Sequence, residues 1–299
     1  MTKLLVLLTM DCETARKDVT PHAAAMSASG PQDYAESERS IRGYQSIADE
    51  HGYPLTIFAH PEVAAAHRDL LLELQSAGAC LGLHLHPYKF ADGRYTEDLG
   101  LYSASKQREI LGAATSAWAL KMDQTPRYFR AGYFSANDTT FGELRGLGFK
   151  GGSLSIPGRV LPAHGSVWAG AELYPHRAHF SFRHLRGRSD FVEVPVSVDT
   201  FRPVEKGAAG EQGYEWLYVP AGYDHEQVVK DLLARALSDA PELFPIVLDT
   251  HNDQDFLDAG SAARKNLDLI LETLEGESAK VGLEPVGATV ETVCDLVRA

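Results

Sequence analysis

The opening run of the chain is the feature that most constrains its fold. Residues 4–8 are five consecutive aliphatic side chains, and residues 9–13 read Thr-Met-Asp-Cys-Glu. A short apolar run of this kind is typical of a strand that is buried on both faces of a parallel sheet. Because side chains alternate along a strand, we expect Asp11 and Glu13 on one side and Cys12 on the other. The run therefore predicts two carboxylates that converge where a buried strand ends.

A second strand-like run carries two histidines with the same spacing. Residues 79–83 are mostly apolar and lead directly into His84 and His86, which stand just before Pro87. If both runs belong to one parallel sheet or barrel, their carboxyl ends open on the same face, where such folds place their chemistry. Two carboxylates and two imidazoles form a donor set that suits a divalent metal ion.

Helix and strand patterns alternate along the rest of the chain. Helical spacing and caps predict helices over residues 37–51, 62–77, 105–122, 138–147, 224–238, 260–275 and 289–297. Further strands are predicted over residues 55–59, 127–130, 191–199 and 245–250. Residues 87–102 are expected to form a long loop, and residues 151–213, with many Pro, Gly and His, to be less regular. With no repeat and no linker, the pattern predicts one α/β barrel-like domain over residues 1–299.

Composition limits the partners of such a domain. The chain has 299 residues, 44% of them hydrophobic, and a formal net charge of −13. The acidic balance argues against nucleic acid as a partner, since a phosphate backbone requires clustered cations. The apolar run near the start is too short for a membrane span or a signal-peptide core, so we expect a cytoplasmic protein without a membrane partner. The three scattered cysteines are expected to be small buried hydrophobic residues rather than parts of disulfides. The sequence is compatible with a homo-oligomer.

Together these motifs resemble the polysaccharide deacetylase, or NodB-homology, family of carbohydrate esterases. The resemblance rests on the order and spacing of five stretches, in the fourth of which Gly132 replaces the family's usual proline. These stretches are residues 9–13, Phe58 with the helix after it, residues 82–87, residues 129–133 and residues 248–251. The resemblance implies a distorted (β/α) barrel and a metal-dependent hydrolase that removes an acetyl group from an N-acetylated or O-acetylated sugar or oligosaccharide.

The same resemblance implies the ligands of the metal. Glu13 corresponds to the metal-binding acid and His84 to the first metal-binding histidine. The family's second histidine usually stands four residues after the first, where this chain has Tyr88, and His86 is the obvious substitute. The ion implied is most simply zinc, with cobalt, nickel or manganese as alternatives.

The catalytic roles also carry over residue by residue. Asp11 matches the general base, Arg130 matches the arginine that holds this base, and His251 matches the late histidine that acts as general acid. A cationic Arg130 beside Asp11 is expected to keep that carboxylate ionised. The family's usual partner for the late histidine is not visible, and Asp199 and Asp249 are weak candidates for it.

Several aromatic residues are candidates for substrate contacts. The candidates that could stack on a sugar ring or line the site are Tyr88, Tyr133, Trp168 and Tyr174. A cluster of four histidines is too irregular in spacing for a second metal site and fits loop or groove residues better: His164, His176, His179 and His184.

Other interpretations stay open. Asp11 and Glu13 could cap a turn or pair with Arg16 or Lys17, and His84 and His86 could be structural histidines. The same barrel could hydrolyse a non-sugar amide or a cyclic imide. Alternatively, the chain could be a carbohydrate-binding pseudoenzyme with a degraded metal site.

Overall fold

A curled sheet forms the centre of the protein. The computed structural model describes residues 3–16, 29–204 and 210–299. The strands of the sheet are β1 (Lys3–Cys12), β2 (Leu55–Ala59), β3 (Cys80–Leu85), β4 (Tyr128–Ala131), β5 (Gly151–Gly152), β8 (His176–Arg177), β9 (Val192–Glu193), β12 (Leu243–His251) and β13 (Pro285–Gly287). Their order is β12-β1-β2-β3-β4-β5-β9-β8, with β13 also paired to β1. All pairs are parallel except β8 with β9.

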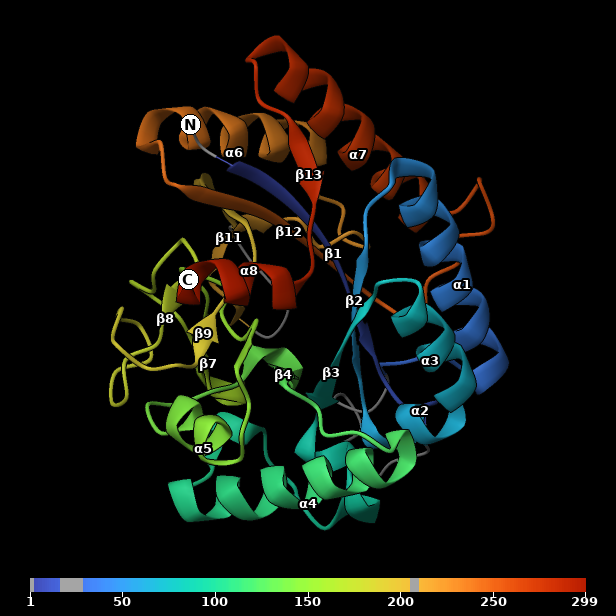
Figure 1. The fold of residues 1–299 in the computed structure, drawn as a ribbon, viewed down its shortest axis with the longest axis vertical. Coiled ribbons are helices and arrows are strands. Elements are labelled where there is room, and N and C mark those ends of the chain that lie inside the picture. Colours follow the sequence, from blue (N-terminus) through green and yellow to red (C-terminus); the bar gives the residue numbers. More distant parts are fainter. Residues whose placement is uncertain (1–2, 17–28, 205–209) are drawn as a thin grey trace.

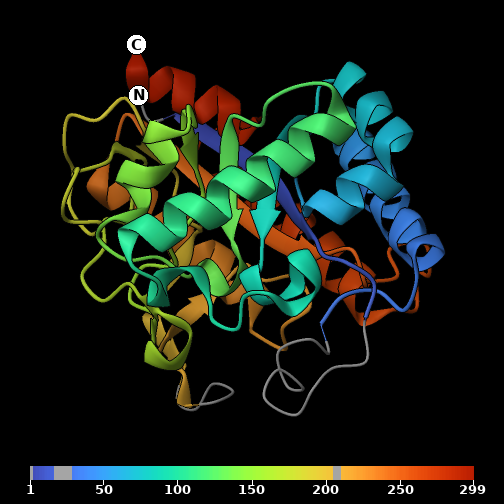
Figure 2. The same cartoon turned by 90° about the horizontal axis from the view of Figure 1, so that it is seen from below.

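Helices pack around the outside of this sheet, except α8, which lies over the middle of the curl (Figure 1). They are α1 (Tyr34–His51), α2 (Pro61–Ala66), α3 (Arg68–Ser76), α4 (Ala104–Met122), α5 (Thr140–Gly146), α6 (His225–Asp239), α7 (Ala262–Lys280) and α8 (Val290–Arg298). Figure 2 places both chain ends on the face to which α8 belongs, while the parallel strands run toward the opposite face. Since β-strand carboxyl ends carry the chemistry in such folds, the opposite face is where a site is expected.

Two hydrophobic clusters explain why β1 forms a buried strand. Its residues Leu4, Val6 and Leu8 belong to the larger cluster, which also contains the buried faces of the outer helices. Leu5 and Leu7 belong to the second cluster, inside the curl of the sheet. Every side chain from Leu4 to Cys12 is buried, as the continuous apolar run predicts for a strand covered on both faces.

The curl is closed in part by irregular segments beside β12. The Ser197 hydroxyl donates to the Pro245 carbonyl at 3.0 Å and accepts from the Val247 amide at 2.9 Å. Residues 217–219 add backbone hydrogen bonds to Asp249 on the same strand. Two small antiparallel pairs complete the described strands: β6 (Val160–Leu161) with β7 (Ser166–Val167), and β10 (Val198–Val204) with β11 (Gly213–Trp216). The predicted α/β distorted barrel is confirmed.

Two predicted elements differ from those in the structure. The helix expected over residues 62–77 is broken at His67, whose φ of −112° and ψ of 26° lie outside the helical region, and it becomes α2 and α3. The strand expected over residues 191–199 is divided between β9 and the first two residues of β10, because Pro195 has no amide hydrogen for a ladder and Ser197 turns to β12. The expected loop over residues 87–102 contains three short 3₁₀ turns.

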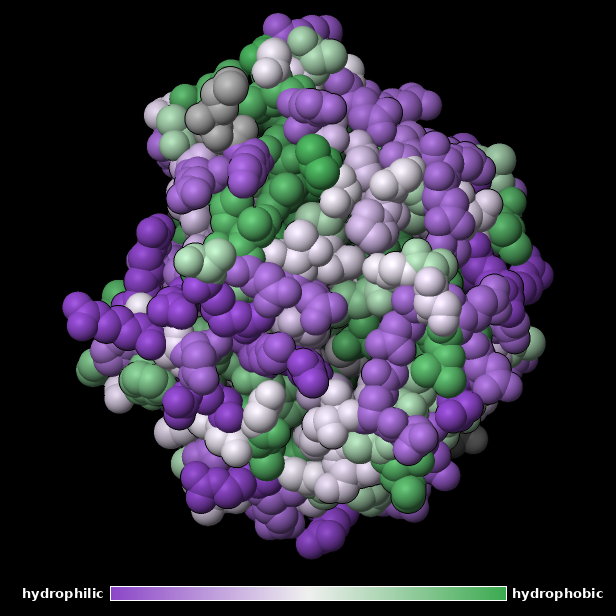
Figure 3. Space-filling model, viewed as in Figure 1, coloured by the Kyte–Doolittle hydropathy of each residue, from purple (hydrophilic) through white to green (hydrophobic). Residues whose placement is uncertain are grey.

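The surface and the cysteines agree with a charged globular chain. Hydrophilic residues cover most of the face in Figure 3, and hydrophobic residues gather between α6 and α8. Within the described residues, no helix combines the length and the apolar character that a membrane crossing requires. Cys12, Cys80 and Cys294 are buried free thiols, as expected from their spacing.

Candidate metal centre

Strand ends bring the predicted polar residues together. At the end of β1, Asp11 and, just after the strand, Glu13 continue the face of Leu5 and Leu7, which points into the curl. Parallel pairing sets Asp11 opposite His251 on β12. The next pairs along the sheet place β3 between β2 and β4, with its last residues beside those of β4. The register therefore gathers acids, imidazoles and a guanidinium at one end of the sheet.

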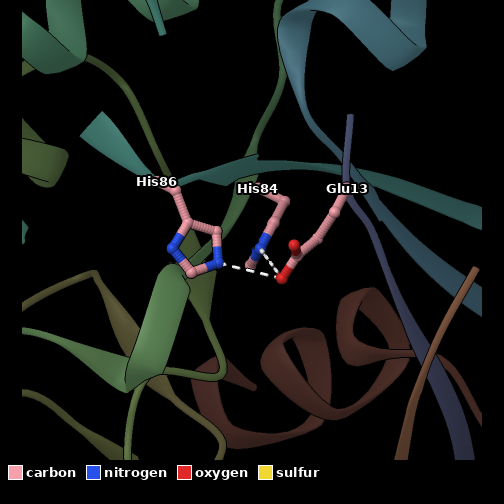
Figure 4. A group of neighbouring side chains, drawn as sticks. All are labelled: Glu13, His84 and His86. Carbon is pink, nitrogen blue, oxygen red and sulfur yellow. Dashed lines mark hydrogen bonds and ion pairs between the residues drawn. The ribbon is translucent and has the colours of Figure 1, made fainter. Parts of the chain in front are cut away.

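Glu13, His84 and His86 form a compact buried group (Figure 4). One ligand atom from each lies within 4.8 Å of the others. Glu13 Oε1 is 3.0 Å from His86 Nε2 and 4.0 Å from His84 Nε2. Among the described residues, this is the only group of three or more His, Cys, Asp or Glu side chains with such spacing. The arrangement provides one carboxylate oxygen and two imidazole nitrogens around a common point.

The chemistry of these three side chains fits a divalent metal ion. Neither ring nitrogen of His84 has a hydrogen-bond partner within the described part of the chain, although the residue is 1% exposed. Burial, reinforced by the neighbouring His86, holds the pKa of His84 well below its usual value, which favours the neutral imidazole that metals bind. Burial alone would raise the pKa of Glu13, but His86 and Lys89 lower it well below the usual range. A carboxylate and two imidazoles match the ligands of catalytic zinc sites, which keep further positions open.

A glycine makes the position of His86 sterically possible. A Cβ atom on Gly132 would lie 2.2 Å from the His86 ring, closer than any non-bonded contact allows. The two departures from the family pattern, Gly132 for proline and His86 for a histidine at position 88, are thus in direct contact. Tyr88 lies behind this pair, with its ring centroid 5.2 Å from that of His86.

Asp11 lies in a network with a second carboxylate. Arg130 Nη1 donates to Asp11 Oδ1 at 3.1 Å and to Asp249 Oδ1 at 2.5 Å. Burial, reinforced by Asp249, raises the pKa of Asp11 to about 8 despite the opposing charge of Arg130. Arg130 is thus beside Asp11 as expected, but its guanidinium is shared between two desolvated carboxylates, so its charge is divided between them. A bound dication would act in the opposite direction and favour the charged carboxylate.

His251 is oriented by a tyrosine. Its Nδ1 lies 3.0 Å from the Tyr218 hydroxyl, and its Nε2 lies 3.5 Å from Glu13 Oε1. Burial lowers the pKa of His251, but Glu13 and the nearby aspartates outweigh it and raise the pKa above its usual value. Asp249 and Asp199, the candidates for its partner, make other contacts: Asp249 with Arg130, and Asp199 with the Phe201 amide at 2.9 Å.

These residues open into a cavity of about 400 Å³. Its opposite wall comes from the irregular part of the chain and is aromatic, with the Trp216 and Tyr218 rings stacked at 5.2 Å. Tyr133 and Phe134, each with a φ of 54°, occupy a strained turn at the edge. The residues that line this wall are Tyr133, Phe134, Arg159, Glu211, Trp216, Tyr218, Ala221 and Tyr223.

Of the four aromatic residues expected to touch substrate, only Tyr133 lines the cavity. Trp168 is completely buried against Phe141 and donates its indole N–H to the Phe134 carbonyl at 2.8 Å. Tyr174 contacts Phe244 and Asp239 outside the cavity. Trp168 and Tyr174 are therefore not part of the lining of this cavity.

The four clustered histidines and Arg16 all contact residues other than the site acids Asp11 and Glu13. Each of the four histidines has a separate hydrogen-bond partner: His164 with Asp98, His176 with the Tyr174 carbonyl, His179 with the Ser181 amide and His184 with the Val167 carbonyl. Arg16 lies 4.0 Å from Asp253 rather than at either site acid. Lys17 lies outside the described residues.

Sequence reasoning missed three residues of the site. Lys89 contacts Glu13, Tyr218 contacts His251, and Trp216 stacks on Tyr218. The alternation of Tyr214, Trp216 and Tyr218 is a signal that could have indicated an aromatic face. Nothing in the local pattern around Lys89 indicates that its side chain turns inward.

Comparison with known proteins identifies the fold. No family model and no curated protein sequence matches the chain. Among solved structures, a protein assigned as a polysaccharide deacetylase from Mycobacterium smegmatis matches with a TM-score of 0.57 and 18% identity, over 99% of this chain and 90% of that one. The chain has the fold of the polysaccharide deacetylases.

Two further structures of this fold match equally well. One is assigned as a polysaccharide deacetylase from Pseudomonas aeruginosa PAO1, with a TM-score of 0.59 and 13% identity over 98% of this chain and 90% of that one. The other is the PuuE allantoinase, with a TM-score of 0.59 and 13% identity over 98% of this chain and 89% of that one. The likeness to the deacetylase fold extends over the whole sheet and its helices.

Proposed function

We propose that the protein is a metal-dependent hydrolase of the deacetylase type, which releases acetate from an N-acetylated or O-acetylated sugar or oligosaccharide. The observation that carries the proposal is the buried Glu13–His84–His86 group at the carboxyl ends of β1 and β3, next to Asp11 and His251. These three side chains would hold the metal ion, most simply zinc. When bound, such an ion polarises the scissile carbonyl and a water molecule.

The remaining residues would move the protons of the reaction. Asp11 would accept a proton from the attacking water, since its carboxylate faces the cavity and lies 3.6 Å from His84 Nδ1. Arg130 would fix Asp11 from behind, in the interior of the sheet. His251 would give a proton to the departing amine or alcohol through Nε2, because Tyr218 engages the other ring nitrogen.

The aromatic wall would position the substrate. Flat rings such as Trp216 and Tyr218 pack well against the apolar face of a sugar ring, and Tyr133 lines the same space. The cavity volume of about 400 Å³ lies in the lower part of the range for small-molecule sites, which also favours a second candidate. This candidate is hydrolysis of a compact non-sugar amide or cyclic imide by the same residues.

A substrate panel tests the proposal. Zinc-loaded protein is incubated with N-acetylglucosamine, its oligosaccharides, O-acetylated xylo-oligosaccharides and a cyclic imide such as succinimide, and acetate release or ring opening is measured. We expect acetate release that requires the metal and disappears in Asp11→Asn. Ring opening without acetate release would favour the second candidate, and saturable sugar binding without any turnover would favour the pseudoenzyme.

A further inference from the structure

The two carboxylate oxygens of Glu13 have different surroundings. Oε1 faces the imidazoles, at 3.0 Å from His86 Nε2 and 3.5 Å from His251 Nε2. Oε2 faces the opposite way, forms an ion pair with Lys89 Nζ and accepts a hydrogen bond from Ser29 Oγ at 2.7 Å. The carboxylate therefore offers one oxygen to the histidines, while its other oxygen is already engaged.

Lys89 is built into this position rather than resting there from the surface. Its side chain is only 5% exposed, and lysine is rarely so buried unless it is paired. Nζ also donates to the Ser29 carbonyl at 3.0 Å and to Ser29 Oγ at 2.7 Å. The backbone amide of Lys89 donates to the His86 carbonyl at 3.0 Å, within the 3₁₀ turn Pro87–Lys89. This turn therefore holds the candidate ligand His86 and also the ammonium group of Lys89, which contacts the other candidate ligand Glu13.

The charge of Lys89 matters because the pair is desolvated. The Glu13 carboxylate carries one negative charge, which the ammonium group offsets. The ammonium group at Glu13 Oε2 withdraws electron density from the carboxylate. It also repels a metal ion bound at Oε1, and burial reduces the solvent screening of both effects. Lys89 is not among the described residues that line the cavity, so it acts on Glu13 and does not touch substrate.

We propose that Lys89 is a positioning residue that limits Glu13 to a single oxygen toward the metal ion, and that its charge makes the site bind this ion less tightly than Glu13, His84 and His86 would alone. A loosely held, electron-poor ion is the stronger Lewis acid, so the arrangement exchanges affinity for reactivity. The inference rests on the proposed metal site.

Metal titration of the full-length protein tests the inference without an activity assay. Metal-free wild type, Lys89→Met and the control Lys106→Met are titrated with Zn²⁺ in competition with a chelator, and with Co²⁺ for the visible spectrum. Lys106 is a suitable control because it pairs with Glu109 on the surface of α4. We expect Lys89→Met to bind zinc about 10- to 100-fold more tightly, at unchanged stoichiometry, because removing the ammonium group removes its repulsion of the bound dication. Its cobalt spectrum should weaken as the second Glu13 oxygen raises the coordination number, and Lys106→Met should match wild type.

A second variant keeps the inference testable if Lys89→Met does not fold. Lys89→Gln removes the charge but keeps a polar side chain, and zinc binding should become tighter in this variant too. Unchanged or weaker zinc affinity in folded Lys89→Met or Lys89→Gln would overturn the role of Lys89. Stoichiometric zinc binding by wild type in the same experiment would still support the proposed function. Wild-type protein that binds neither metal would overturn the metal site itself.

Discussion

The two walls of the cavity are built in different ways. One wall, here called the metal wall, carries the proposed ligands Glu13, His84 and His86. It comes from the ends of β1, β3 and β12 in one sheet, where backbone register and the two-residue period fix which side chains point inward. The aromatic wall comes from the turn after β4 and from residues 211–223, where only the short β10–β11 pair and one bridge between Tyr218 and Asp249 hold the backbone. The long parallel ladders of the metal wall suit a catalytic reaction, in which the reacting groups tolerate little displacement. The shorter strands and loops of the aromatic wall suit the binding of a particular substrate.

Asp11→Asn should give the largest effect, because it removes a proton acceptor from the metal wall. We expect kcat to fall by about 10²- to 10⁴-fold while metal content stays at the wild-type level, since the three ligands are untouched. Steady-state kinetics and metal analysis on the same preparation check both parts. Asp69→Asn is the control, because Asp69 is exposed on α3. Substantial turnover in Asp11→Asn would remove this residue from the mechanism.

Gly132→Ala should damage the metal wall from outside it. The added methyl group would meet the His86 ring and push it from its place, so we expect metal affinity to fall by about 10- to 100-fold. Gly146→Ala is the matched control, since a Cβ there meets nothing within 4 Å. Calorimetric titration with Zn²⁺ measures the difference. Equal affinity in the two variants would show that His86 is not a ligand.

Tyr218→Phe changes a residue at the junction of the two walls, because Tyr218 contacts both His251 and Trp216. Loss of one hydroxyl should lower kcat by about 10-fold, the value of one hydrogen bond to a group that carries charge in the reaction. KM should stay close to wild type, since the ring remains in place. Tyr174→Phe, outside the cavity, should change neither constant. A rise in KM with unchanged kcat would instead assign Tyr218 to substrate binding.

Trp216→Leu should give the smallest effect, confined to the aromatic wall. Loss of one stacking ring should raise KM by about 3- to 10-fold with little change in kcat. Trp168→Leu offers the contrast, because that ring is fully buried in the core. This variant should leave KM unchanged and lower the free energy of unfolding by about 2–4 kcal/mol, which a denaturant titration measures. Equal KM values in Trp216→Leu and wild type would place substrate away from this wall.

The metal wall could be predicted from the sequence, and the aromatic wall could not. Asp11, Glu13, His84 and His86 follow apolar runs, so a two-residue period and parallel pairing are enough to bring them together. Arg130 and His251 needed the family resemblance, since their own runs show no other signal. Trp168 and Trp216 look alike in sequence, yet one fills the core and one lines the cavity, because packing against distant parts of the chain decides which way each ring turns.

Two contacts between distant positions of the chain could not be predicted from the sequence either. Tyr218 replaces the expected acidic partner of His251 from 33 positions away in the chain, and Lys89 meets Glu13 across 76 positions. Neither contact has a local pattern. Both depend on how loops fold over the end of the sheet, which no periodicity encodes.

Metal content tests the central claim most directly. Protein purified without an affinity tag is analysed by mass spectrometry for bound metals, comparing wild type with the double variant His84→Ala, His86→Ala, and each is then reloaded with Zn²⁺. We predict close to one equivalent of a divalent metal per chain in wild type and almost none in the double variant, with both chains folded. Equal metal content in the two proteins, or a wild type that stays free of metal after reloading, would contradict the account.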